Sequence, residues 1–137
     1  MTPGLAALLH PHPIAELISH MARDEPFVVH GACDSIAELL AIPFLGSLEA
    51  LLAAWPDRVD VHLPDVADEA SSMTVQPSEA RTHFGAGMAL LFNEVQRHAP
   101  ELVQWLEGIR TELGLSALTQ QRCLIYATPA SKGTTAH

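Results

Sequence analysis

The residues whose types and spacing best suit a chemical function lie at the end of the sequence. A strand-like run, Cys123–Ala127, leads into a Pro/Gly loop at residues 129–133 and then into Thr134 and His137. An imidazole in such a place is a nitrogen ligand for a transition metal. Taken alone, a terminal histidine is more often an exposed surface residue than a metal ligand. The residues before His137 must therefore be considered with it.

The wider segment carries a family resemblance. Pro129-x-Ser131-x-Gly133-x-x-x-His137, placed after an apolar strand, resembles the approach to the iron site in JmjC-type and cupin-like 2-oxoglutarate oxygenases. That group includes the bacterial ribosomal oxygenases and the asparaginyl hydroxylases. In it, a strand delivers the first histidine of an HxD motif into a double-stranded β-helix. Thr134-x-Ala136-His137 also resembles the asparaginyl-hydroxylase form, in which the threonine hydroxyl contacts 2-oxoglutarate.

Two earlier stretches carry the same resemblance in the family's order. Residues 90–100 and the amphipathic helix after them resemble the strand, loop and helix that precede the metal strand in the bacterial members. Residues 26–31, Pro-Phe-Val-Val-His-Gly, resemble the family's opening strand. With the terminal segment, the resemblance covers about half of the chain.

The resemblance implies Fe(II) held by two histidines and one carboxylate, with 2-oxoglutarate as co-substrate. It assigns His137 as the first iron ligand and both Thr134 and Tyr126 as contacts to 2-oxoglutarate. The sequence stops at His137, before the aspartate and the second histidine of the family. We therefore expect the N-terminal portion of a dioxygenase, a hydroxylase of a protein side chain, that does not hold iron tightly by itself.

Two other interpretations stay open. The chain could be a non-enzymatic, acidic protein-interaction module in which His137 has no role. It could also belong to a cupin-like metal protein that does not use 2-oxoglutarate. No GxGxxG motif, P-loop or nucleophile elbow is present to favour a different enzyme class.

Apolar periodicity predicts an α+β fold in a single domain over residues 1–137, with an irregular lead-in at 1–13. The family resemblance adds that its elements lead into a double-stranded β-helix, a cupin or jelly-roll core that is incomplete in this chain. Helices are predicted after Pro13, from a Ser35–Glu38 capping box, from Ser47 to Trp55 and from Pro100 to Leu113. Strands are predicted at residues 27–29, 59–63, 73–75, 88–92 and 123–127.

Two of the predicted strands have notable polar residues within or directly after them. Asp60 and His62 alternate with apolar neighbours, which predicts that His62 points away from the core as a solvated residue. Asn93 directly follows the 88–92 strand. It is expected to cap or pair locally, with a place near the substrate entrance as the alternative.

Charge and composition limit the partners. The chain carries 16 acidic and 7 basic residues, a formal charge of −9, and no basic cluster, which argues against direct binding to nucleic acid or to anionic membranes. A basic protein or peptide would be attracted, and a homodimer is left open. No basic leader or membrane-length apolar run is present, so the expected location is the cytoplasm. Cys33 and Cys123 lack CxxC spacing and are expected to be reduced thiols.

Overall fold

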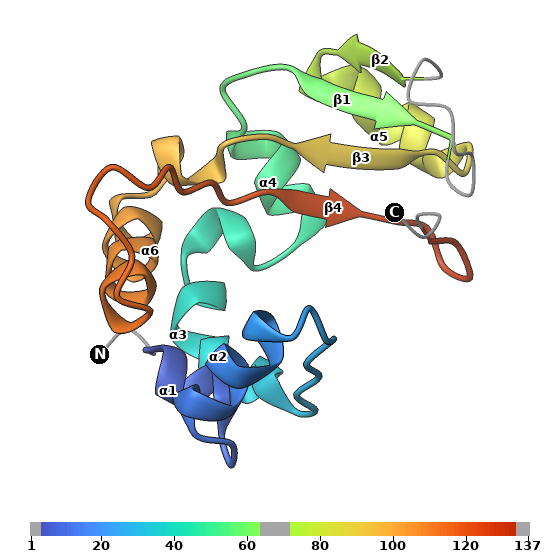
Figure 1. The fold of residues 1–137 in the computed structure, drawn as a ribbon. Helices are drawn as coiled ribbons and strands as arrows, with labels where there is room; N and C mark the ends of the chain where they lie inside the picture. The colour runs from blue at the N-terminus through green and yellow to red at the C-terminus, as the bar shows by residue number, and fades with distance from the viewer. Residues whose placement is uncertain (1–3, 64–71, 134–137) are drawn as a thin grey trace. The chain divides into compact units, whose positions relative to one another are not determined.

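The computed structural model describes residues 4–63 and 72–133 (Figure 1). The structure is α+β, with helices accompanying one four-stranded sheet. Contacts within the chain define two compact units. We call the unit within Met1–Ile42 and Gln96–Gln121 the helical unit, and the unit within Pro43–Val95 and Arg122–His137 the sheet unit.

The helical unit is built from short helices and one longer helix. Its elements are α1 (Leu5–Leu9), α2 (Ile14–Ala22), the 3-10 helix η1 (Ala32–Ile36), α3 (Ala37–Leu40) and α6 (Pro100–Glu112). The 3-10 helix η4 (Val95–His98) lies where the chain passes between the two units. Pro100 starts α6 where a missing N–H costs nothing, and Gly114 follows the helix at φ 66°, the left-handed position predicted for it.

Residues after α6 are tied back onto that helix. The Glu107 carboxylate accepts hydrogen bonds from Arg110 Nε at 2.8 Å and from Gln121 Nε2 at 3.3 Å. The Arg110 hydrogen bond holds the pKa of Glu107 below its ordinary value. Arg110 also donates to the carbonyl of Leu115, so one guanidinium joins the helix to the segment that leads towards the last strand.

The sheet unit places four strands in the order β2-β1-β3-β4 (Figure 1). Its elements are the 3-10 helix η2 (Pro43–Leu45), α4 (Leu48–Ala54), β1 (Val59–His62), β2 (Ser72–Val75), α5 (Pro77–Gly85), β3 (Ala89–Phe92) and β4 (Ile125–Ala127). Every neighbouring pair of strands is antiparallel. The order puts β2 and β4 at the edges and leaves β1 and β3 in the middle.

One face of this sheet forms the core of its unit. Val59 and Val61 on β1 and Leu90 and Phe92 on β3 are all 0% exposed, and Val61 lies opposite Leu90. Helix α5 packs against β1 and β3 and contributes the fully buried Ala80. Because side chains alternate along each strand, these apolar residues all lie on one face of the sheet. Their burial contributes hydrophobic stabilisation to the sheet unit.

The helical unit departs from the sequence predictions in three places. Residues 5–9 form α1, with Leu5 and Leu9 buried, inside the lead-in predicted to be irregular. The predicted 27–29 strand is not formed; Phe27 packs between the rings of His12 and His20, at 5.4 and 5.2 Å. The Ser35–Glu38 box does not cap a helix, because the Ser35 hydroxyl donates to Ala7 O at 3.0 Å.

The sheet unit confirms most predicted elements. The Ser47 cap forms, with its hydroxyl accepting from Ala50 N at 3.1 Å. Strand β4 is shorter than predicted and starts at Ile125. Helix α5 was not predicted, although Pro77 at its first position and the Glu79 carboxylate that accepts from Gln76 N at 3.0 Å are recognisable start signals. The described strands form one antiparallel sheet, and the double-stranded β-helix stays a prediction.

Among the helices of the described residues, none combines the length and the apolar character that crossing a membrane requires.

Candidate functional site

Strand β4 is the element that the sequence assigned to the delivery of His137. It pairs antiparallel with β3, with Tyr126 opposite Leu91. The segment before β4 is held to the start of η4, which follows β3, by a hydrogen bond from Val95 N to Cys123 O at 2.9 Å. After the strand, a turn closes with Lys132 N donating to Pro129 O at 3.1 Å. Thr134 and His137 lie outside the described residues, so the strand and the turn are the described part of this predicted site.

Tyr126 lies on the face of the sheet opposite to the core. We call this the open face; it is made by alternate residues of the four strands: Asp60, His62, Ser72, Thr74, Ala89, Leu91 and Tyr126. Ala89 is buried, whereas the others are partly or largely exposed. The predicted outward orientation of His62 is confirmed by this register, because its neighbour Val61 points into the core.

A chain of polar contacts crosses the open face. Thr74 Oγ1 donates to Asp60 Oδ1 at 3.0 Å, and Asn93 Nδ2 donates to Asp60 Oδ2 at 2.6 Å. Both carboxylate oxygens of Asp60 therefore have a partner, from β2 on one side and from the end of β3 on the other. These hydrogen bonds link β1 to β2 and to the residue that follows β3, and they pair Asn93 with Asp60.

A pair of rings lies next to this polar chain. The centroids of His62 and Tyr126 are 6.2 Å apart with an interplanar angle of 61°, an edge-to-face arrangement. The two residues come from β1 and β4, which are not neighbours in the sheet. No local pattern in the sequence predicts this pairing, because strand order decides which remote residues share one patch of a sheet.

Metal ligands do not gather in the described part of the chain. Within residues 4–63 and 72–133, no three His, Cys, Asp or Glu side chains lie close enough together to hold a metal ion. These residues alone do not fit a complete iron site, which needs two histidines and a carboxylate. A centre that includes His137 would need its other ligands from residues outside this set.

Cys123, just before β4, carries its sulfur as a thiol and not in a disulfide. Partial burial raises its pKa, since the low-dielectric surroundings disfavour the thiolate. A raised pKa makes the thiol a weaker nucleophile near neutral pH, which argues against a catalytic role for Cys123.

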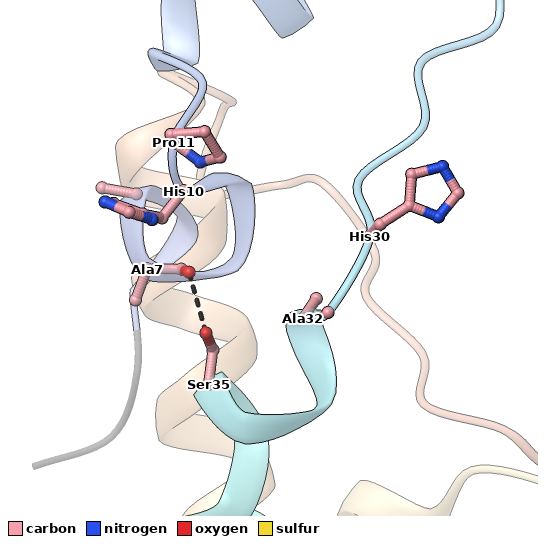
Figure 2. Close-up of a pocket in the computed structure, with 8 residues that line it drawn as sticks. Ala7, His10, Pro11, His30, Ala32 and Ser35 are labelled. Atoms are coloured by element: carbon pink, nitrogen blue, oxygen red, sulfur yellow. Dashed lines mark hydrogen bonds between the residues drawn. The ribbon is translucent and has the colours of Figure 1, made fainter.

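The helical unit contains an open pocket of about 700 Å³. It is lined by Ala6, Ala7, His10, Pro11, His30, Gly31, Ala32 and Ser35. Figure 2 shows the rings of His10 and His30 on opposite sides of the Ser35–Ala7 hydrogen bond. The lining contains no Asp, Glu, Lys or Arg, so the sheet unit offers the better candidate for chemistry.

Comparison with known proteins shows a distant relative but does not show a family. No protein-family model matches the chain. The chain is 26% identical over 137 residues to "Uncharacterized protein YxbC" of Bacillus subtilis (strain 168). The match covers 97% of this chain but only 42% of the relative. The chain therefore spans less than half the length of this relative, whose name indicates no activity.

Proposed function

We propose that this chain is part of an Fe(II)- and 2-oxoglutarate-dependent dioxygenase that hydroxylates a protein side chain. The observation that carries the proposal is the antiparallel edge strand β4, which bears Tyr126 on the open face and leads through a turn towards Thr134-x-x-His137. This is the order of elements that the family resemblance requires of its metal strand.

Each candidate residue has a defined task in this proposal. The imidazole of His137 is one iron ligand, and two further ligands come from outside the described residues. The hydroxyls of Tyr126 and Thr134 hold the carboxylate of 2-oxoglutarate by hydrogen bonds. Bound iron with 2-oxoglutarate would supply oxidation of an unactivated C–H bond; the protein's own part is to orient the substrate and exclude water.

The sheet supports the proposal through its two unlike faces. The core face is filled by valine, leucine and phenylalanine, whereas the open face carries polar and aromatic side chains. In a double-stranded β-helix, the open face would line the cavity between two sheets. In this proposal, residues beyond His137 complete a double-stranded β-helix.

The negative charge of the chain favours a basic protein or peptide as substrate, because opposite charges increase the rate of encounter. The proposal also places the protein in the cytoplasm, because 2-oxoglutarate and a protein substrate would both be available there.

The test uses the protein expressed from the complete open reading frame that encodes this chain. Iron binding is measured by titration of the metal-free protein with Fe(II) under nitrogen, and turnover by conversion of 2-oxoglutarate to succinate in air. The matched variants are His137→Ala and His30→Ala, because His30 is an exposed histidine of the helical unit. Stoichiometric iron binding and succinate formation should be lost in the first and kept in the second.

The outcomes separate the three interpretations. Metal binding that depends on His137 without consumption of 2-oxoglutarate would contradict the oxygenase and support a cupin-like metal protein. A wild-type protein that binds no iron would support the interaction module. Equal activity of His137→Ala and wild type would remove the assignment of the first ligand.

A further inference from the structure

Helix α2 of the helical unit presents an apolar side to solvent. Its residues, Ile14–Ala22, include no buried one, although their sequence is strongly amphipathic. Ile18 is 47% exposed and Met21 is 62% exposed, and their spacing of three residues makes them neighbours on the helix surface. Ala15 and Ala22 are also exposed and lie beside Ile18, three residues before it and four after it.

The side of α2 that packs within the helical unit is a different one. Helix α2 contacts α1, and its partly buried residues include Leu17 and His20, which are one turn apart. Residues advance by about 100° around a helix, so Ile18 and Ala22 lie on the side away from these two. A short helix is stabilised mainly by packing of its apolar residues. An exposed cluster of such residues on a nine-residue helix therefore indicates a binding surface.

Negative charge lies at the end of this apolar side. Asp24 follows the helix, and its backbone N–H donates to Met21 O at 3.2 Å. Among the described residues no cation pairs with Asp24, whereas Arg23 Nε donates to the Glu25 carboxylate at 2.8 Å. The carbonyl end of the helix adds partial negative charge at the same place. Residues 4–42 contain five acidic residues and one basic residue, so this part of the chain is negative.

We propose that the exposed side of α2 docks a basic amphipathic helix of a partner protein. Apolar side chains of the partner cover Ile18 and Met21, and a Lys or Arg of the partner reaches Asp24. The small Ala15 and Ala22 allow a close approach, because the distance between packed helices depends on the side chains at the contact. A second copy of this chain fits less well, since each copy carries a formal charge of −9. The docking surface does not depend on the proposed oxygenase activity.

The first measurement asks whether this surface is accessible in the full-length protein. Dilute hydrogen peroxide converts exposed methionines to the sulfoxide, and mass spectrometry after digestion follows each one. Met21, at 62% exposed, should be oxidised at least as fast as Met73, at 48%. Slow oxidation of Met21 at every protein concentration would mean that the rest of the protein covers α2. Protection that grows with protein concentration would mean that a second copy covers it, and either result would overturn the proposal.

The second measurement uses a helical peptide as the probe. The peptide is built from Leu, Ala and Lys, with its leucines along one side, and a matched peptide carries Glu in place of every Lys. The lysine peptide should bind the full-length protein and slow the oxidation of Met21 but not that of Met73. The glutamate peptide should bind at least about tenfold more weakly at low salt, because its charges repel those near Asp24.

Variants locate the binding surface. Ile18→Ser should weaken binding of the lysine peptide about three- to tenfold, because less apolar surface is buried. Asp24→Asn should weaken binding about two- to fivefold at low salt, and added salt should reduce this difference. Asparagine tolerates the φ of 55° at this position, so the backbone is kept. The matched control is Leu118→Ser, which removes a 91% exposed apolar side chain elsewhere in the helical unit and should leave binding unchanged.

The results can overturn the docking site without touching the oxygenase. The thermal unfolding midpoint of each variant shows that it is folded. Failure of wild type to bind the lysine peptide, or equal binding of the two peptides, would overturn the proposal. Equal losses in Ile18→Ser and Leu118→Ser would overturn it as well, because binding would then not be located on α2. Formation of succinate and its dependence on His137 test the oxygenase separately.

Discussion

Replacing Phe92 with alanine should be among the most destabilising single changes in the sheet unit. Phe92 is 0% exposed, lies in β3, one of the two middle strands, and packs edge-to-face on Trp55 with ring centroids 5.2 Å apart. Trp55 is itself only 6% exposed, and its indole Nε1 donates to Arg58 O at 3.1 Å. Because Trp55 is held in this way, its ring has limited freedom to refill the space that Phe92→Ala opens.

The size of the effect follows from this packing. Truncating a buried phenylalanine to alanine costs about 3–5 kcal/mol, and more when the surroundings cannot collapse. The ring pair contributes about 0.5–1.5 kcal/mol of that value, which places Phe92→Ala near the upper end of the range. For a chain of this size the midpoint of thermal unfolding should fall by roughly 10–20 °C.

Urea denaturation followed by tryptophan fluorescence measures this change in the free energy of unfolding. The control is Leu118→Ala, since Leu118 is 91% exposed and its truncation should change stability by less than about 0.5 kcal/mol. The packing argument would be refuted by a loss below about 1.5 kcal/mol for Phe92→Ala at an unchanged dependence on urea.

Two further predictions concern a helix cap and a buried thiol. Ser47→Ala removes the hydroxyl that accepts from Ala50 N, so the free energy of unfolding should fall by about 1 kcal/mol. Ser47→Asp should keep the wild-type stability, and equal stability of all three proteins in urea would contradict the cap. Burial raises the pKa of Cys123, so its folded thiol holds its proton to higher pH than the unfolded one. That contribution to stability is complete below the unfolded pKa and is lost as the pH rises through the folded pKa. In a Cys33→Ser background, alkylation by iodoacetamide at pH 8 should be slower in the folded than in the urea-unfolded protein, and equal rates would count against the burial.

Local sequence patterns correctly predicted the elements whose stabilising contacts are between residues close in sequence. The Ser47 hydroxyl caps α4 through a residue three positions away, and Gly114 ends α6 through its own backbone angle. Alternation of Val59 and Val61 with His62 predicted both β1 and the side of the sheet on which His62 lies. Such signals act within one turn or one strand, so the sequence by itself determines them.

Predictions failed where a remote group offered a better partner. Ser35 donates to the carbonyl of Ala7, and α3, the helix that it was predicted to start, has no side-chain cap. Phe27, in a run rich in β-branched residues, packs between two histidines instead of joining a sheet. A propensity is worth less than about 1 kcal/mol per residue, so a single tertiary contact can outweigh it.

Strand order is the feature that only the tertiary structure decided. The sequence indicated separate strands, but it did not indicate that β1 lies between β2 and β3, or that β4 pairs with β3. That order brings His62 and Tyr126 together over Ala89 and joins Asp60 to Asn93. Pairing between distant strands is fixed by burial of the whole core face, a property that no single segment of the sequence contains.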